Sequence, residues 1–211
     1  MNRKIFLDCG ANRGQSIIAA KKQFGSDTEI YSFEAVSVLY NKLVDKWNND
    51  PKVHLYNNIV WDKEDIVKIY ISTEWSDAST LYLEKSDRKI DKNIYNEIKS
   101  IDLSDFIKTN FDPNDYIILK LDIEGAEYDV LYHLIQTGVL SYVNELWGEW
   151  HLDKFPRDYI INNLGYKQDA IYSKLEELKL PFKEWHAYVD DKEKLLLTLD
   201  DENRMPLNEI I

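Results

Sequence analysis

The sequence predicts an α/β protein built around one open, doubly wound and mostly parallel sheet with helices on both faces. Short apolar runs of strand length alternate along the chain with segments whose apolar residues recur at helical spacing. Polar residues also close or follow the strands, as expected where a ligand binds beyond their carboxyl ends: Asp8, Glu34, Asn58, Asp122 and Glu149. At 211 residues the chain suits a single domain over 1–211.

Two strand-turn-helix units open the chain. The apolar run Ile5 to Leu7 predicts a strand, and the following helix is marked by apolar spacing at Ile17, Ala20, Lys21 and Phe24. Glu29 to Phe33 is rich in strand-forming residues. The next helix is predicted from Leu39, Tyr40, Leu43, Val44 and Trp47, with Ser37 as its N-cap.

Three further strands are predicted over Val53–Val60, Val67–Ile71 and Tyr116–Leu121, the last of them buried on both faces. A helix follows, marked by Ala126, Val130, Leu131, Leu134 and Ile135, and it is expected to stop at Gly138. Tyr142–Trp147 then predicts another strand. These elements continue the alternation expected of a doubly wound sheet.

The C-terminal part predicts two helical segments and a late strand. Pro156 suits a helix start, Ile160, Ile161 and Leu164 its interior, and Gly165 its end. Leu175 and Leu178 continue helical spacing as far as Pro181, and Leu195–Leu199 suits a strand. We expect a cofactor-binding core over about 1–151, completed by 152–211.

Composition excludes several classes of protein. The chain is 44% hydrophobic and 30% charged, which is typical of a globular domain. No apolar run approaches the roughly 20 residues of a membrane span, and no signal peptide precedes the first strand, so we expect a cytoplasmic protein. The net charge of −12 argues against nucleic acid as a partner. The single cysteine, Cys9, is expected to be a small buried residue.

The turn Asp8-Cys9-Gly10-Ala11-Asn12-Arg13-Gly14 lies between a strand and a helix. Glycines there let the backbone approach a ligand, and the helix N-terminus presents free N–H groups. The dinucleotide fingerprint requires a third glycine, which this turn lacks. An NAD-binding oxidoreductase is therefore a weaker alternative.

Glu34 closes the second strand, 20 residues after Gly14. An acid at this place can accept hydrogen bonds from both ribose hydroxyls of an adenosine cofactor. The other interpretation is a solvated acid at a strand end. Taken with the glycine turn, Glu34 favours an adenosine-containing ligand.

The run Leu119-Lys120-Leu121-Asp122-Ile123-Glu124-Gly125-Ala126-Glu127, together with that turn and Phe33-Glu34, resembles the FkbM family of methyltransferases. Ile101-Asp102-Leu103 and Glu149-Trp150-His151 extend the resemblance, which covers roughly Ile5 to His151. It implies a Rossmann-like class I methyltransferase fold and S-adenosylmethionine as the methyl donor, with S-adenosylhomocysteine as product. The reaction it implies is O-methylation, often of sugars or of glycosylated and polyketide products.

The resemblance also implies roles for residues at matching positions. Those that would hold the methionine end of the cofactor are Asp8, Gly10, Asn12 and Gly14. Glu34 would hold the ribose, Asn58 with Ile59 the adenine edge, and Asn57 could replace Asn58. Members of the family usually carry more residues ahead of the first strand. The chain is thus either a minimal form or one module of a longer polypeptide, in which a neighbouring or fused glycosyltransferase could hand over its product.

A sugar hydroxyl needs a base to become a competent nucleophile. His151 is the preferred base. Asp122, which ends a buried strand beside the expected cofactor, is the competing candidate. The alternative interpretation of His151 is a surface histidine in a loop without a catalytic role. Asp122, Glu149 and His151 could instead gather around Mg²⁺, a divalent metal that we do not favour but that could lower the hydroxyl pKa.

The acceptor site is predicted less sharply. Ser79, within Ser76 to Thr80, and Glu124 are candidate substrate-binding residues, although Glu124 and Glu127 could simply favour a helix N-terminus. Trp150, with Trp147 and Trp185, could offer aromatic faces to a sugar. Lys120 is expected to pair with an acid. We expect a sugar or glycan acceptor, such as a terminal deoxyhexose. The alternatives are a non-sugar metabolite and a non-catalytic module that binds an adenosine cofactor.

Overall fold

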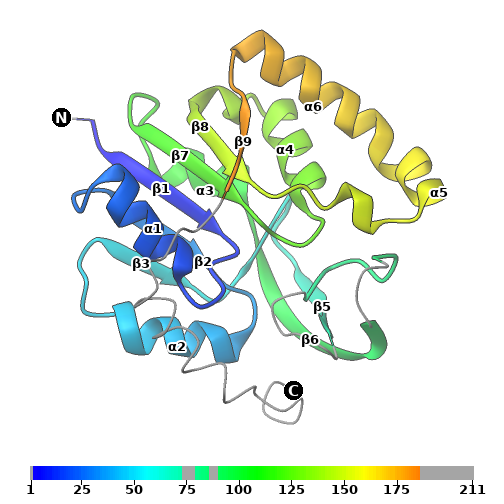
Figure 1. The fold of residues 1–211 in the computed structure, drawn as a ribbon, viewed down its shortest axis with the longest axis horizontal. Helices are drawn as coiled ribbons and strands as arrows, with labels where there is room; N and C mark the ends of the chain where they lie inside the picture. Colours follow the sequence, from blue (N-terminus) through cyan, green and yellow to red (C-terminus); the bar gives the residue numbers. More distant parts are fainter. Residues whose placement is uncertain (1, 73–78, 86–89, 186–211) are drawn as a thin grey trace.

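The centre of the protein is a six-stranded sheet in which every pair of neighbours is parallel (Figure 1). The computed structural model describes residues 2–72, 79–85 and 90–185. The strands, in their order across the sheet, are β3 (Val53–Tyr56), β2 (Glu29–Phe33), β1 (Lys4–Cys9), β7 (Tyr116–Leu121), β8 (Val143–Gly148) and β9 (Phe182–Glu184). The chain runs outward from β1 on one side and from β7 on the other. The order therefore reverses between β1 and β7, which confirms the predicted doubly wound, Rossmann-like arrangement.

Helices cover both faces of this sheet (Figure 1). One face packs against α1 (Gln15–Phe24) and α2 (Ser37–Trp47), in a core that includes Phe6 and Ile118. The other face packs against α3 (Leu103–Asn110), α4 (Glu127–Gln136) and α6 (Gly165–Leu178), in a core that includes the alternate residues Ile5 and Leu119. Successive residues of β1 and β7 point to opposite faces, both of them covered by helices, which explains why both strands are mostly apolar.

The segment Val53–Val60 is two strands and not the single strand predicted. It divides into β3 and β4 (Ile59–Trp61), which belong to different sheets. Asn57 lies at the break, where its amide nitrogen donates to the carbonyl oxygens of Glu34 at 2.8 Å and Ala35 at 3.3 Å. Asn57 thus attaches the end of β3 to the backbone that follows β2, and the next strand, β4, belongs to the second sheet.

A second sheet of three strands has the order β4-β6-β5. β5 (Ile66–Ser72) confirms the predicted strand over Val67–Ile71, and it pairs antiparallel with β6 (Ile90–Asp102). The sequence prediction missed β6 because the strand is polar and mostly half-buried or exposed. It also missed α3, whose signal is Asp102, which accepts hydrogen bonds from the backbone N–H groups of Ser104 and Asp105.

Two predicted helix boundaries are wrong. Ser37 is the first residue of α2 and makes no cap; its hydroxyl donates to Asn57 Oδ1 at 3.0 Å. Gly165 does not end a helix, because its backbone is helical, with φ of −58° and ψ of −46°. A short helix, α5 (Arg157–Tyr159), leads through a π turn over Ile160–Leu164 directly into α6. α6 then ends before Pro181, as predicted.

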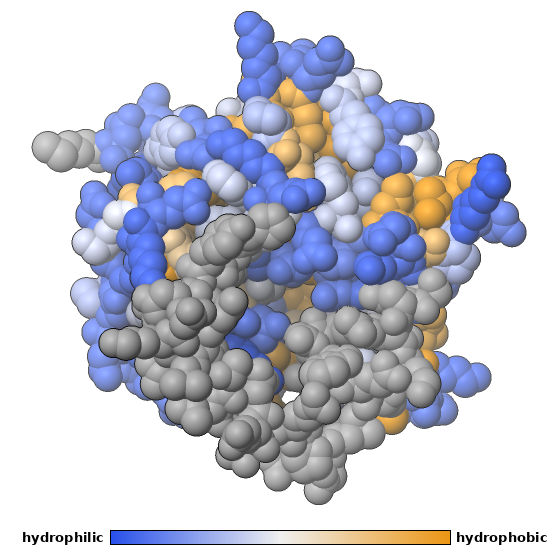
Figure 2. Space-filling view, viewed as in Figure 1, coloured by the Kyte–Doolittle hydropathy of each residue, from blue (hydrophilic) through white to orange (hydrophobic). Residues whose placement is uncertain are grey.

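The last described strand, β9, pairs parallel with β8 at the sheet edge and was missed because it has only three residues. The predicted strand over Leu195–Leu199 lies outside the described residues. Hydrophilic side chains make up most of the coloured surface in Figure 2, and a smaller apolar group lies near the position of α5. No helix in the described part of the chain combines the length and apolar character that a membrane crossing requires.

Gly148 allows β7 and β8 to approach closely where both strands end. A Cβ atom at this position would lie 1.9 Å from the carbonyl oxygen of Leu121, which accepts the N–H of Glu149 at 3.0 Å. We expect Gly148→Ala to lower the free energy of unfolding by roughly 3 kcal/mol, because two backbone segments must move apart. Urea denaturation would measure the loss.

Gly138→Ala is the matched control. A Cβ atom there meets nothing within 4 Å, although the residue has φ of +76°. We expect a loss of only about 1 kcal/mol, from backbone strain alone. Equal losses in the two variants would contradict the steric explanation for Gly148.

Candidate functional site

A pocket of about 320 Å³ lies at the carboxyl ends of the main strands. Residues that follow four neighbouring strands line it in the order of the sheet: Glu34 after β2, Gly10 after β1, Asp122 after β7 and Glu149 after β8. The pocket therefore spans the switch point between β1 and β7, where ligands of doubly wound sheets bind. Its volume is within the range of small-molecule sites.

The structure brings most of the predicted site residues together. Those that line the pocket are Gly10, Asn12, Glu34, Asn58, Ile59, Ser79, Asp122, Glu124, Glu149 and His151. Of the alternatives Asn57 and Asn58, it is Asn58 that lines the pocket. Ser76–Ala78, predicted to shape the acceptor site with Ser79, lie outside the described residues. Three predicted residues, Asp8, Gly14 and Trp150, do not line the pocket.

Asp8 and Gly14 make structural contacts on either side of the glycine turn. The Asp8 side chain is fully buried, where it accepts the Ser32 hydroxyl at 3.1 Å and lies 3.3 Å from the Lys120 ammonium. This contact confirms the predicted pairing of Lys120 with an acid. Gly14 faces Leu43 and Trp47, so it allows α1 and α2 to approach closely. Neither residue lines the pocket, so their contact with the methionine end of a cofactor stays a prediction.

The predicted aromatic lining is wrong. Trp150 stacks on Phe182, with ring centroids 4.1 Å apart, and Trp147 packs against Trp185 at 5.7 Å. Among the described residues that line the pocket, Phe33 is the sole aromatic one. These tryptophans are partly buried and pack against the hydrophobic cores on the two faces of the sheet.

Glu34 is a buried carboxylate and not a solvated acid at a strand end. Its side chain is 7% exposed, with Oε1 accepting the Val36 N–H at 2.8 Å and Oε2 accepting the Asn12 N–H at 2.7 Å. Burial raises the Glu34 pKa to about 7, even though these two backbone hydrogen bonds lower it. Glu34 thus ties β2 to the glycine turn and changes charge near neutral pH.

The turn after β1 offers the pocket a close backbone and an unsatisfied acceptor. Gly10 has φ of +92°, and a Cβ atom there would lie 1.9 Å from the Asp122 carbonyl oxygen. Asn12 adopts φ of +49°, and its buried side-chain oxygen has no hydrogen-bond partner in the described structure. A ligand that donates a hydrogen bond, such as a hydroxyl or an ammonium group, would satisfy that oxygen.

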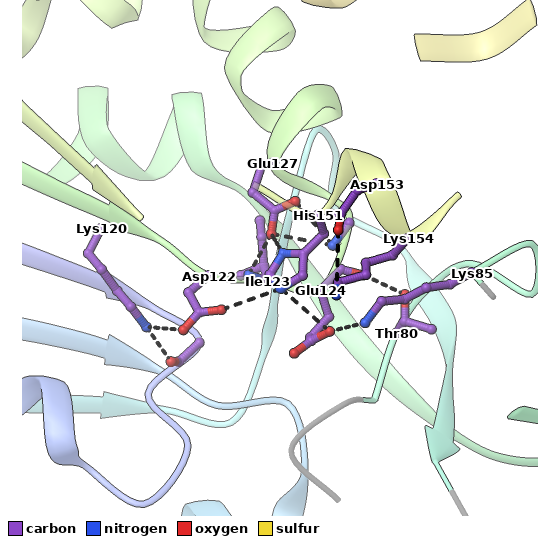
Figure 3. A network of polar contacts seen from close by, with 12 residues as sticks. Thr80, Lys85, Lys120, Asp122, Ile123, Glu124, Glu127, His151, Asp153 and Lys154 are labelled. Carbon is purple, nitrogen blue, oxygen red and sulfur yellow. Dashed lines mark hydrogen bonds and ion pairs between the residues drawn. The ribbon is translucent and has the colours of Figure 1, made fainter. Parts of the chain in front are cut away.

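His151 and Glu127 form a buried pair at the other end of the pocket (Figure 3). His151 Nδ1 lies 2.9 Å from Glu127 Oε1, and Glu127 is fully buried. Glu127 also accepts the backbone N–H groups of Ile123 at 2.9 Å and Gly125 at 3.1 Å. The sequence suggested only a helix-dipole role for Glu127, because spacing along the chain could not reveal its contact with His151.

His151 presents its second nitrogen to two acids. Nε2 lies 3.7 Å from Glu124 Oε2 and 4.0 Å from Asp122 Oδ1. Burial lowers the His151 pKa, but the hydrogen bond with Glu127 and the charges of the three acids overcome it and raise the pKa to about 9. At neutral pH the imidazole is therefore protonated in this structure.

Donor atoms of Asp122, Glu149 and His151 all lie within 4.8 Å of one another. Carboxylate and imidazole groups at such distances can hold a divalent cation. Glu127 behind Nδ1 is the carboxylate partner that histidine ligands of metals commonly have. The three residues therefore meet as expected for the predicted alternative, a metal site.

Comparison with known proteins identifies one family. The family model described as the methyltransferase FkbM domain matches residues 8–167. No curated protein and no solved structure matches the chain. The matched range begins at Asp8, near the end of β1, and extends past His151 into α6, so it contains every residue described above as lining the pocket.

The raised His151 pKa predicts how pH affects stability. Because the pKa is about 9 in the folded protein and 6.5 ordinarily, protonated His151 stabilises the fold fully below about pH 6.5. This stabilisation disappears as pH rises through about 9. We expect the difference in unfolding free energy between wild type and His151→Gln to shrink by roughly 3 kcal/mol from pH 6 to pH 10.

Urea denaturation in EDTA measures that difference without interference from bound metal. Gln keeps a side-chain amide that can donate to Glu127, so its packing defect is the same at every pH. A difference that stays constant from pH 6 to pH 10 would contradict the raised pKa.

Proposed function

Because the chain belongs to the FkbM methyltransferase family, we propose that it transfers the methyl group of S-adenosylmethionine to a hydroxyl of a sugar or glycan. The observation that carries the proposal is the order of groups along one pocket. Glu34, a buried acid after β2, lies toward one end, and the His151–Glu127 pair lies beyond β8 at the other. A cofactor and an acceptor can therefore lie side by side across the switch point.

We expect the parts of the cofactor to lie along the pocket in that order. Glu34 would accept hydrogen bonds from the ribose hydroxyls, with Asn58 and Ile59 at the adenine edge. Gly10, Asn12 and Asp122 would hold the methionine end, and the unsatisfied Asn12 oxygen suits a donor there. When bound, S-adenosylmethionine supplies an electrophilic methyl group on a sulfonium. The acids in the lining favour that positive charge.

His151 would act as the base that takes the proton from the acceptor hydroxyl as the new bond forms. Glu127 holds Nδ1, which leaves Nε2 directed toward Glu124 and Asp122. With a pKa of about 9, the imidazole must first lose its proton. A positive charge nearby lowers the pKa of an imidazole. Binding of the positively charged cofactor would therefore favour the neutral form of His151, which can accept a proton. Asp122 is the competing base.

A divalent cation held by Asp122, Glu149 and His151 is the second candidate mechanism. The observation that favours it is the closeness of their donor atoms, within 4.8 Å. A cation there would take the place of the His151 proton and lower the pKa of the acceptor hydroxyl. The two mechanisms make opposite predictions for chelators.

The lining also bears on the acceptor. Asp122, Glu124 and Glu149 would repel a phosphorylated sugar, which favours a neutral one. Ser79 and Glu124 could hydrogen-bond its hydroxyls. A non-sugar metabolite is the alternative acceptor, and a glycosyltransferase that supplies the acceptor, whether separate or fused, stays a prediction.

Calorimetric titration with S-adenosylhomocysteine tests the cofactor. We expect micromolar binding, with no binding of NAD under the same conditions. Binding of NAD alone would favour an oxidoreductase. Binding of neither ligand would overturn the proposed function. If S-adenosylhomocysteine binds, a panel of neutral and phosphorylated glycosides and non-sugar alcohols, assayed with S-adenosylmethionine, tests the acceptor class.

The raised pKa of Glu34 predicts how the affinity for the cofactor depends on pH. Its pKa of about 7 means that the carboxylate is protonated as pH falls below 7 and accepts hydrogen bonds less well. We expect the affinity for S-adenosylhomocysteine to fall between pH 8 and pH 6 in wild type. Glu34→Gln should bind about tenfold more weakly at pH 8 and show little change with pH.

Glu29→Gln is the matched control for Glu34, because Glu29 begins the same strand and lies at its opposite end. It should retain the affinity and the pH dependence of wild type. If Glu34→Gln behaved in the same way, Glu34 would not be the ribose ligand.

His151→Ala tests the base. We expect an unchanged dissociation constant for S-adenosylhomocysteine and a loss of kcat on the order of 10²- to 10⁴-fold, measured with an acceptor from the panel. An unchanged kcat would remove His151 from the mechanism. EDTA should leave wild-type kcat intact. A loss that Mg²⁺ restores would instead support the metal mechanism.

A further inference from the structure

Lys120 carries a buried charge directly beneath the pocket (Figure 3). Its side chain is 1% exposed, and its ammonium donates to the Gly10 carbonyl at 2.6 Å. The same group lies 3.3 Å from Asp8 Oδ1 and 3.5 Å from Asp122 Oδ2. Lys120 lies opposite Asp8 in the pairing of β7 with β1, so these groups meet where both strands end.

These contacts exceed what a structural ion pair requires. Asp8 is fully buried, and its charge alone would balance that of Lys120. The ammonium nevertheless also contacts Gly10 and Asp122, both of which line the pocket. Asp122 is 34% exposed, with Oδ2 toward Lys120 and Oδ1 toward His151. Lys120 thus connects the core to two groups that face the ligand space.

The loops after β1 and β7 already meet at one backbone contact. The Asp122 N–H donates to the Cys9 carbonyl at 3.1 Å, and the backbone of Gly10 lies too close to Asp122 to admit a Cβ atom. Lys120 adds a second connection, between the carbonyl of the first loop and the carboxylate of the second. The positions of both oxygens therefore depend on one ammonium group.

We propose that Lys120 is a positioning residue for the amino-acid end of the cofactor, acting through Asp122 and the Gly10 turn. This inference rests on the proposed function. If Glu34 holds the ribose at β2, the next strands, β1 and β7, place Gly10 and Asp122 beside the methionine portion. The α-ammonium of that portion requires anionic or carbonyl acceptors, and Lys120 fixes the Asp122 carboxylate in reach of it.

Lys120→Met tests the proposal, because methionine keeps the length and removes the charge. The measured quantity is the change in affinity for each of two ligands. S-adenosylhomocysteine has the amino-acid end, and 5′-methylthioadenosine lacks it. We expect affinity for the first to fall about tenfold or more, and for the second to change less than about twofold. General damage to the pocket would lower the affinity for both ligands equally.

Lys21→Met is the matched control, since Lys21 also forms an ion pair with an aspartate, Asp50 at 2.7 Å, but does not line the pocket. It should bind both ligands as wild type does. If Lys120→Met does not fold, Asp8→Asn combined with Lys120→Met removes the unbalanced Asp8 charge and should show the same split.

The outcomes separate the inference from the proposed function. Wild type that binds neither ligand would overturn the proposed function and the inference with it. Wild type that binds both, with equal or no loss in the Lys120 variant, would overturn the inference alone. A loss confined to S-adenosylhomocysteine would support the positioning role.

Discussion

The close approach of the loops after β1 and β7 is the constraint on which the site depends. The Gly10 backbone lies against Asp122 with no room for a Cβ atom, and Asp122 donates back to Cys9. This contact lies at the switch point, where the chain leaves the sheet in opposite directions. The pocket opens directly above it, with Glu34 on one side and His151 on the other.

Two buried charge networks flank that contact and share one residue. Lys120 and Asp8 form the first, below the glycine turn, and Glu127 with His151 forms the second, beyond β8. Asp122 faces both, with one carboxylate oxygen 3.5 Å from Lys120 and the other 4.0 Å from His151. Buried charges are costly unless paired, so each network holds its members in fixed positions. Under the proposed function, this single carboxylate would link the cofactor end of the pocket to the acceptor end.

The sequence predicted which residues end strands, because apolar runs and the acids that close them are local features. Glu34, Asp122 and Glu149 were identified in this way, and all three line the pocket. The sequence could not predict how deeply each side chain is buried. Asp8 also lies near the end of a strand, yet its carboxylate is buried and points toward Lys120. Partners distant in the chain were also hidden, as for Glu127 with His151 and Trp150 with Phe182. β6 was missed because a polar strand of a small sheet lacks a clear apolar period.

The charge of the pocket links cofactor binding to the state of the base. In this structure His151 is held protonated by Glu127, Glu124 and Asp122, so the acids around it are partly neutralised. Under the proposed function, these acids would also lie near the positive charge of the bound methyl donor, and the protonated imidazole would compete with that charge for them. The proton is the one that can leave, because the sulfonium charge is permanent. With the uncharged sulfur of the product in place of the donor, His151 would regain the full attraction of its neighbours. Under the proposed function, His151 would therefore be free to accept a proton mainly while the methyl donor is bound.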